Sequence, residues 1–181
     1  KRDWSSDVCS SDLALTPEPL TAAAVLAVRV LADSRNDVLK GMLLEGLVSG
    51  EILPAVAWQE EAGSLDVNNI NVQATPAGDG FRVNGSKRFI MGATSADGYI
   101  VSARSGQELV LLSVPRDTPG ATLQFDALAD GRQSGTLTLT NVIVPKAQVL
   151  NSGAAAAESL ARAIDHTAAI IGAEDRKSTR L

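Results

Sequence analysis

Residues 51–150 alternate between apolar and polar side chains, and turn-forming residues interrupt the alternation at short intervals. Side chains on a strand point to opposite faces in turn, so a period of two predicts short β-strands. The expected strands are residues 70–74, 81–83, 87–91, 99–103, 109–114, 121–125 and 136–144. Because no helical segment separates them, we expect an antiparallel β-sandwich or barrel.

Two turn signals lie early in this region. Residues 76–80 and the dipeptide Asn84-Gly85 each predict a hairpin turn, since Gly and Asn tolerate the backbone angles of tight turns. The glycines of the first turn do not predict a phosphate-binding loop, because no helix follows whose N-terminus would hold the anion.

Helical spacing of apolar residues flanks the strand region. Residues 20–50 predict two helices, and residues 154–174 predict one amphipathic helix with a single apolar stripe. We therefore expect an α+β fold: the end of an N-terminal helical domain at 14–50, a β domain at 51–150, and the first helix of a C-terminal bundle at 151–174.

The ends of the predicted helices have recognisable capping residues. Thr21 is expected to cap the first helix, and Asp33 or Ser34 the second. Gly50 is expected to end the second helix in the left-handed conformation that glycine adopts easily.

Residues 1–13 and 175–181 have no helical or strand period that continues the fold. One back-translation of residues 7–12 is, apart from a one-base shift, the reverse complement of one for residues 175–180. That DNA resembles a widely used sequencing adapter, so we expect both ends to be adapter-derived and not part of the fold.

Charge and composition limit the partners of the chain. A formal net charge of −5 gives no basic surface for nucleic acid or anionic membranes. The longest apolar stretch, residues 21–32, is shorter than the roughly 20 residues of a membrane-spanning helix. One Cys and one His exclude an internal disulfide framework and a Cys- or His-rich metal site. We expect a cytoplasmic protein with no nucleic-acid partner, no metal and no membrane span.

Two pairs of neighbouring polar residues are candidates for chemistry. Glu60 and Glu61 would point to opposite faces of a strand, so they do not form a catalytic pair, and at least one is expected to be a solvated surface acid. Asp165 and His166 would diverge by about 100° on a helix, and no Ser or Cys nucleophile motif is near them. His166 is therefore expected to be a surface or interface residue.

Short motifs recur in a fixed order between residues 54 and 145. They are Pro54-Ala-Val-Ala-Trp-Gln-Glu-Glu-Ala-Gly-Ser-Leu-Asp66, Val83-Asn-Gly-Ser-Lys-Arg-Phe-Ile-Met-Gly-Ala93, and the segments 96–104, 114–120 and 142–145. In order and spacing they resemble the acyl-CoA dehydrogenase family. The segment 47–50 also resembles the helix end that leads into the middle domain of that family.

The resemblance implies FAD bound between the β domain and a C-terminal four-helix bundle, and oxidation of the Cα–Cβ bond of an acyl-CoA thioester. In the family, hydride passes to flavin N5 and the α-proton to a glutamate of the bundle. That glutamate would lie outside residues 1–181, so the resemblance implies no catalytic residue in this chain, and a fragment that neither retains FAD well nor turns over. Implied partners are acyl-CoA, an electron-transfer flavoprotein as acceptor, and further subunits of a homo- or hetero-oligomer.

Three implied cofactor-binding residues lie on one expected strand. Phe89 resembles the flavin-packing Trp of the family, and Ile90 and Met91 fall at the neighbouring flavin contacts. Met91 replaces the usual Thr, which leaves its backbone N–H as the donor near the ring.

The other implied site residues lie in the first motif. Gln59 falls at the Thr before the motif glutamate, and Val56 and Trp58 flank it on the flavin-facing strand. Ser64 resembles the acyl-CoA-contacting Ser. The alternative for Trp58, Phe89 and Met91 is ordinary strand packing.

Departures from the family pattern suggest a divergent member that acts on an unusual or dicarboxyl acyl group, or a smaller partner subunit of a heteromeric dehydrogenase. Two other classes stay open. One is a related flavoenzyme, an acyl-CoA oxidase or a flavin-dependent monooxygenase. These motifs do not determine whether the reduced flavin of such an enzyme reacts with oxygen. The other is a non-enzymatic β-sandwich binding module, for which three Phe and one Tyr give few aromatic residues to line a face.

Overall fold

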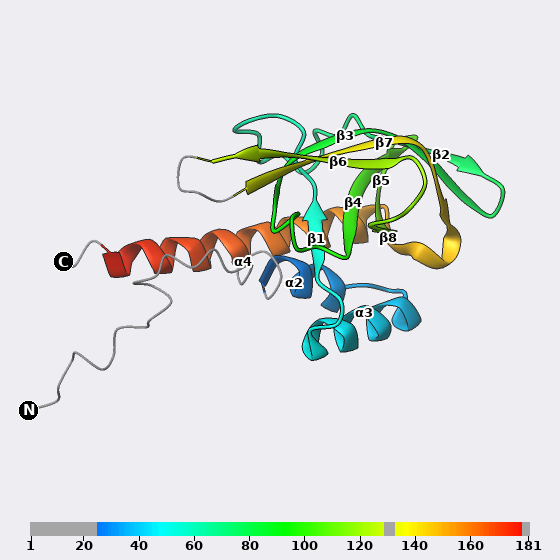
Figure 1. Ribbon diagram of the computed structural model, residues 1–181. Helices are drawn as coiled ribbons and strands as arrows, with labels where there is room; N and C mark the ends of the chain where they lie inside the picture. The colour runs from blue at the N-terminus through cyan, green and yellow to red at the C-terminus, as the bar shows by residue number, and fades with distance from the viewer. Residues whose placement is uncertain (1–24, 129–132, 179–181) are drawn as a thin grey trace, which may run out of the picture.

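A computed structural model describes residues 25–128 and 133–178, which form one eight-stranded sheet and three α-helices (Figure 1). The elements are α2 (Val28–Ala32), α3 (Asp37–Ser49), β1 (Pro54–Ala57), β2 (Gln73–Ala77), β3 (Gly80–Met91), β4 (Gly98–Ser105), β5 (Glu108–Pro115), β6 (Ala121–Ala127), β7 (Gln133–Pro145), the 3₁₀ turn η3 (Lys146–Gln148), β8 (Val149–Ser152) and α4 (Ala154–Ser178). The predicted α+β class is confirmed. None of the described helices is long and apolar enough to cross a bilayer.

The sheet has the strand order β6-β7-β3-β2-β4-β5-β8, and β1 pairs with β4 outside this path. Neighbouring strands run antiparallel, as predicted, except that β1 and β2 run parallel to β4. Residues 54–57 pair with 98–101, and Gln73 pairs with Arg104 further along β4. β1 and β2 therefore follow one another along the same edge of β4, and residues 58–72 leave the sheet between them. We call these residues the β1–β2 loop.

The two predicted hairpin turns have different outcomes. β2 and β3 form the first hairpin, which turns at Gly78-Asp79 with Gly78 at φ 62°. The turn predicted at Asn84-Gly85 is wrong, because β3 continues through these residues and stays paired with β7. The pairing register shifts between Val83 and Gly85, so the dipeptide forms an irregularity in a long strand instead of a reversal.

The start of α3 differs from the prediction and its end agrees with it. The N-cap is Asn36, whose Oδ1 accepts a hydrogen bond from the Leu39 N–H at 3.1 Å. The predicted caps Asp33 and Ser34 are wrong, because their side chains interact elsewhere: the Ser34 hydroxyl donates to the Leu150 carbonyl, and Asp33 pairs with Arg162. Gly50 ends α3 at φ 78°. The predicted cap Thr21 lies outside the described residues.

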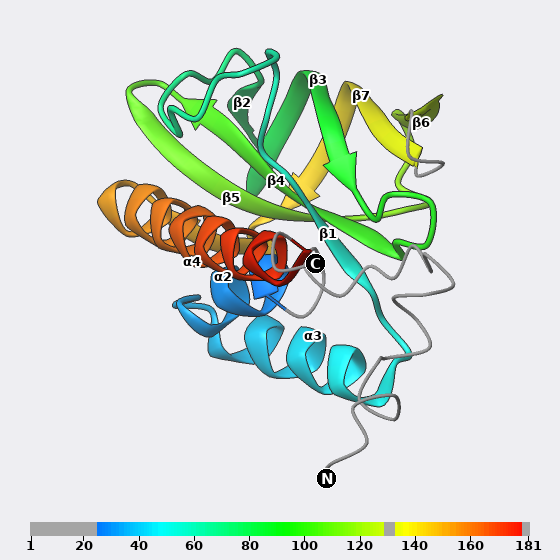
Figure 2. The ribbon, with the colours of Figure 1, turned by 90° about the vertical axis from the view of Figure 1, so that its left-hand side faces the viewer.

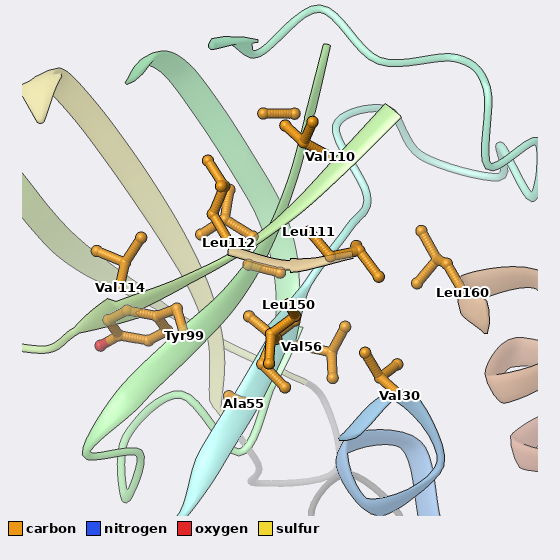
Figure 3. Packing of buried hydrophobic residues seen from close by; sticks show 14 of the residues in the cluster. Val30, Ala55, Val56, Tyr99, Val110, Leu111, Leu112, Val114, Leu150 and Leu160 are labelled. Carbon is orange, nitrogen blue, oxygen red and sulfur yellow. The ribbon is translucent and has the colours of Figure 1, made fainter. Parts of the chain in front are cut away.

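The helices cover one side of the sheet, where α4 lies against β5 and β8 and α2 packs against α4 (Figures 1 and 2). Figure 3 shows Val30 of α2 and Leu160 of α4 directed toward Leu111 and Leu150 in the sheet. These residues belong to one continuous buried apolar cluster that includes both helices and strands. Helices and sheet thus share a core.

The structure describes only part of the two segments that we expect to be adapter-derived. Residues 1–13, which we expect to be adapter-derived, lie outside the described residues. The backbone of α4 continues to Ser178, beyond the predicted end at 174 and into the second segment that we expect to be adapter-derived.

Candidate functional site

β3 changes its pairing with β7 at Arg88-Phe89. Lys87 pairs with Leu137 and Ile90 with Gly135, so β3 contains one residue more than its partner at this point. Phe89 has φ 57°, a left-handed conformation that is rare for a bulky side chain. Such bulges redirect side chains and are frequent beside functional sites. Here the bulge leaves the Phe89 ring half-buried while Ile90 next to it is fully buried.

The chain after β1 lies against this bulge. The backbone N–H of Arg88 donates to the Gln59 carbonyl at 2.8 Å. The side chain of Gln59 also bonds within the β1–β2 loop, where its Nε2 donates to the Ser64 carbonyl at 3.4 Å. Trp58 and Gln59 are half-buried. Four of the predicted site residues, Trp58, Gln59, Ser64 and Phe89, are therefore connected through short backbone and side-chain links.

The other three predicted residues are divided between the interior and the surface. Val56 and Ile90 are 4% and 1% exposed, and Figure 3 shows Val56 near Leu150 and Val30 in the core. The side chains of Val56 and Ile90 are thus turned into the protein. Met91 is 41% exposed, which is high for a large apolar side chain beside a half-buried aromatic residue.

The bulge also carries a cationic group and a close backbone approach. The guanidinium carbon of Arg88 lies 4.9 Å from the centre of the Phe89 ring, within cation–π distance. Gly135, opposite Ile90, leaves no room for a side chain, because a Cβ there would overlap Ala93. The bulge is thus held from both sides, by the chain after β1 and by β7.

A buried ion pair lies directly behind the site. The Lys87 Nζ is 2.7 Å from the Glu60 Oε1 and also donates to the Trp58 carbonyl at 3.1 Å and the Ser102 hydroxyl at 2.9 Å. The Lys87 side chain is 0% exposed and that of Glu60 is 8% exposed. All three Lys87 protons have acceptors, as a buried ammonium group requires.

Glu60 has two further hydrogen-bond donors. The backbone N–H groups of Asn71 and Val72 donate to its carboxylate at 2.7 and 3.1 Å. Glu61 is exposed, so the expectation of at least one surface acid in this pair is confirmed. Sequence reasoning missed the role of Glu60.

Burial and pairing shift both pKa values. Burial lowers the pKa of Lys87 to about 8, against the opposing effect of the Glu60 carboxylate. Burial raises the pKa of Glu60, but hydrogen bonds and charge from Lys87, together with the two backbone donors, outweigh it and leave that pKa lowered. At neutral pH the pair is ionised.

The sequence did contain a signal for Lys87. Val83, Lys87 and Ile90 are the buried positions along β3, so Lys87 occupies a place that the strand pattern reserves for apolar residues. A lysine at such a place needs a buried anionic partner. The pattern does not identify the acidic residue that is this partner, because Glu60 is far from Lys87 in the sequence.

The remaining candidates lie apart from this site. Asp165 and His166 are exposed on α4, and His166 borders a shallow hollow with residues of α2. Within residues 25–128 and 133–178, no three His, Cys, Asp or Glu side chains gather as metal ligands would.

The chain is similar to known proteins of one family. A sequence profile described as the acyl-CoA dehydrogenase middle domain matches residues 55–142. The chain is 25% identical over 169 residues to the acyl-CoA dehydrogenase AFT10-1 of Alternaria alternata, covering 90% of this chain and 39% of that protein. It is 31% identical over 153 residues to the isobutylamine N-hydroxylase of Streptomyces viridifaciens, covering 78% and 40%.

Among solved structures, butyryl-CoA dehydrogenase from Megasphaera elsdenii is similar with a TM-score of 0.73 and 25% identity, over 82% of this chain and 41% of that one. The chain thus spans less than half the length of each of these relatives.

Proposed function

Because this chain belongs to the acyl-CoA dehydrogenase family, with the family's middle domain at residues 55–142, we propose that it is part of an FAD-dependent acyl-CoA dehydrogenase. The observation that carries the proposal is the contact between the β3 bulge and the chain after β1. The hydrogen bond from Arg88 to Gln59 holds two half-buried aromatic residues, Trp58 and Phe89, on neighbouring segments. These are the segments in which the family motifs lie.

The chemistry of these residues fits the isoalloxazine ring of FAD. The ring is flat and apolar across its faces and polar at its edge. Trp58, Phe89 and the exposed Met91 supply apolar contact area, and Gln59 supplies both a donor and an acceptor. A large exposed apolar side chain beside half-buried aromatic residues is typical of a ligand-binding surface.

The roles of this chain are binding and orientation. With FAD bound, Phe89 and Trp58 would pack against the ring and exclude water, Gln59 would hydrogen-bond its polar edge, and the backbone N–H of Met91 would be available as a further donor. When bound, FAD supplies the acceptor for the hydride removed from the acyl chain. The base that takes the α-proton is a glutamate outside residues 1–181.

The substrate and the other partners follow from the same proposal. The β1–β2 loop, with Ser64, contacts the acyl-CoA thioester, and an electron-transfer flavoprotein accepts the electrons. Residues 14–50 belong to the end of an N-terminal helical domain and residues 151–174 to the first helix of a C-terminal bundle. The whole protein is a cytoplasmic homo- or hetero-oligomer.

The test uses the complete gene product, purified with FAD and mixed without oxygen with straight-chain, branched and dicarboxyl acyl-CoA thioesters. We expect at least one thioester to reduce the flavin with formation of one enoyl-CoA per FAD. Phe89→Ala should lower FAD retention more than Phe81→Ala, a matched truncation at the far end of β3. Flavin that no thioester reduces, or equal FAD retention in the two variants, would contradict the proposal.

One observation favours a second candidate. The 31% identity to isobutylamine N-hydroxylase extends over 78% of the chain, so a flavin-dependent monooxygenase is the main alternative. Rapid reaction of the reduced flavin with oxygen, with hydroxylation of an added amine, would support the monooxygenase. Slow reaction with oxygen in the presence of enoyl-CoA would support the dehydrogenase.

A further inference from the structure

The β1–β2 loop interrupts the edge of the sheet. Residues 61–63, 65–66, 68–69 and 71 are exposed, and the loop has no strand or helix of its own. Its local bonds join only near neighbours: Asp66 accepts from the N–H groups of Asn68 and Asn69, the Asn68 carbonyl accepts from Ile70, and Gln59 donates to the Ser64 carbonyl. A loop of this kind needs anchors to hold one conformation, because each ordered residue loses conformational entropy.

Buried polar groups supply those anchors. Lys87 binds the beginning of the loop through the Trp58 carbonyl and the Glu60 carboxylate. The same carboxylate accepts from the N–H groups of Asn71 and Val72, at the end of the loop. A single carboxylate therefore joins both ends of the loop to β3. Arg104, which donates to the carbonyls of Asn68 and Ile70, adds a second anchor at the end of the loop.

Stability alone does not explain such a pair. Two buried charges lose their hydration, and well-packed apolar residues often stabilise a fold equally well. The geometry supports a different role, because the groups that the pair holds are the ones next to the candidate site. The Trp58 carbonyl directly precedes Gln59, which bonds both the β3 bulge and the Ser64 carbonyl.

We propose that the Lys87–Glu60 pair is a positioning device, which fixes the β1–β2 loop and its Ser64 relative to the Phe89 bulge so that the loop is preorganised for substrate. The effect on acyl-CoA binding rests on the proposed function, whereas the fixation of the loop does not. Lys87 and Glu60 act through the residues they hold and are positioning residues.

The first measurement is amide hydrogen exchange on the 181-residue chain without FAD. Lys87→Met should speed exchange at Asn71 and Val72 by about tenfold or more, because the Glu60 carboxylate loses the charge that fixes it. Exchange at buried β5 amides should change much less. Lys40→Met is the matched control: it removes an ion pair of the same 2.7 Å length from the exposed surface of α3, and it should leave the loop unchanged.

A second variant covers the case in which Lys87→Met does not fold. The double variant Lys87→Met/Glu60→Gln removes both charges and keeps an oxygen that accepts from the loop amides, so it should fold and still show faster loop exchange. Unchanged exchange at Asn71 and Val72 would overturn the proposal. So would an equal increase over loop and sheet, because that pattern means a purely structural role.

The second measurement uses the complete FAD-loaded protein. The variant that folds should raise the KM for acyl-CoA several-fold, with a smaller change in kcat, since preorganisation of a binding loop is lost. A lower kcat at unchanged KM would overturn the preorganisation of the substrate loop. Faster loop exchange in a protein whose flavin no thioester reduces would leave the fixation of the loop supported and refute the proposed function.

Discussion

The buried ammonium group of Lys87 predicts an unusual response of stability to alkaline pH. Burial lowers its pKa to about 8, whereas a lysine in the unfolded chain keeps a pKa near 10.4. Between these values the unfolded state binds more protons than the folded state, so the free energy of unfolding rises with pH. The contribution of Lys87 is fully present above about pH 10.4 and is lost as the pH falls through about 8.

The size of the effect follows from the two pKa values. Between about pH 8 and pH 10 the slope approaches 1.4 kcal/mol per pH unit, and the total gain from about pH 7 to pH 10 is about 2 kcal/mol. Other groups also titrate in this range. Burial raises the pKa of Tyr99, for example, which removes stability above about pH 10. The relevant quantity is therefore the difference between the wild type and Lys87→Met.

The assay is urea unfolding of both proteins at several pH values from 7 to 10, with the midpoint and the m-value fitted at each. The free energy of unfolding of the wild type should rise relative to the variant by about 2 kcal/mol over this range. A difference that stays constant or falls would show that Lys87 does not carry a lowered pKa in the folded state. The m-values of the two proteins should agree, since a change in m would signal a different unfolded or native state.

Three further experiments test the local structure. Gly135→Ala should lower the free energy of unfolding by about 1–3 kcal/mol, because the new Cβ would overlap the side chain of a neighbouring residue. Gly41→Ala, which has open space around it in α3, should be neutral or stabilising. The midpoints of urea unfolding compare the two variants. Phe89→Gly should be more stable than Phe89→Ala by about 1 kcal/mol, because both variants lose the ring but only glycine adopts φ 57° freely. Equal thermal midpoints of the two variants would count against backbone strain at the bulge. Asn36→Ala should cost about 1–2 kcal/mol in thermal or urea unfolding, because the Leu39 N–H loses its cap; no loss would show that the cap is not needed.

The sequence predicted the parts of the fold that local pattern controls. β4 and β5 were located because their apolar residues form clear runs between glycine turns, and Gly50 ends α3 as its chemistry predicts. The failure at Asn84-Gly85 has the opposite cause. The dipeptide favours a turn locally, but pairing of residues 86–91 with β7 continues the strand and tertiary contacts prevail.

The candidate site was likewise predicted in part. Motif order brought Trp58, Gln59 and Phe89 into one prediction, and the hydrogen bond from Arg88 to Gln59 joins their segments. Their contact with a cofactor stays a prediction. The left-handed backbone of Phe89 and the pairing of Lys87 with Glu60 were beyond sequence reasoning, because both depend on which segments the fold brings together.

Because β1 and β2 each pair with β4 along the same edge, the sheet does not depend on the length of the loop between them. Both strands keep their positions on β4 whatever number of residues joins them, provided that Glu60 and the end of the loop still meet. Closing a longer loop costs only about 0.6 kcal/mol for each doubling of its length. Insertion, deletion or grafting within the exposed residues 61–66 is therefore a low-cost route to new specificity, in evolution or in the laboratory, because it leaves the anchored end of the loop and the β-sheet unchanged.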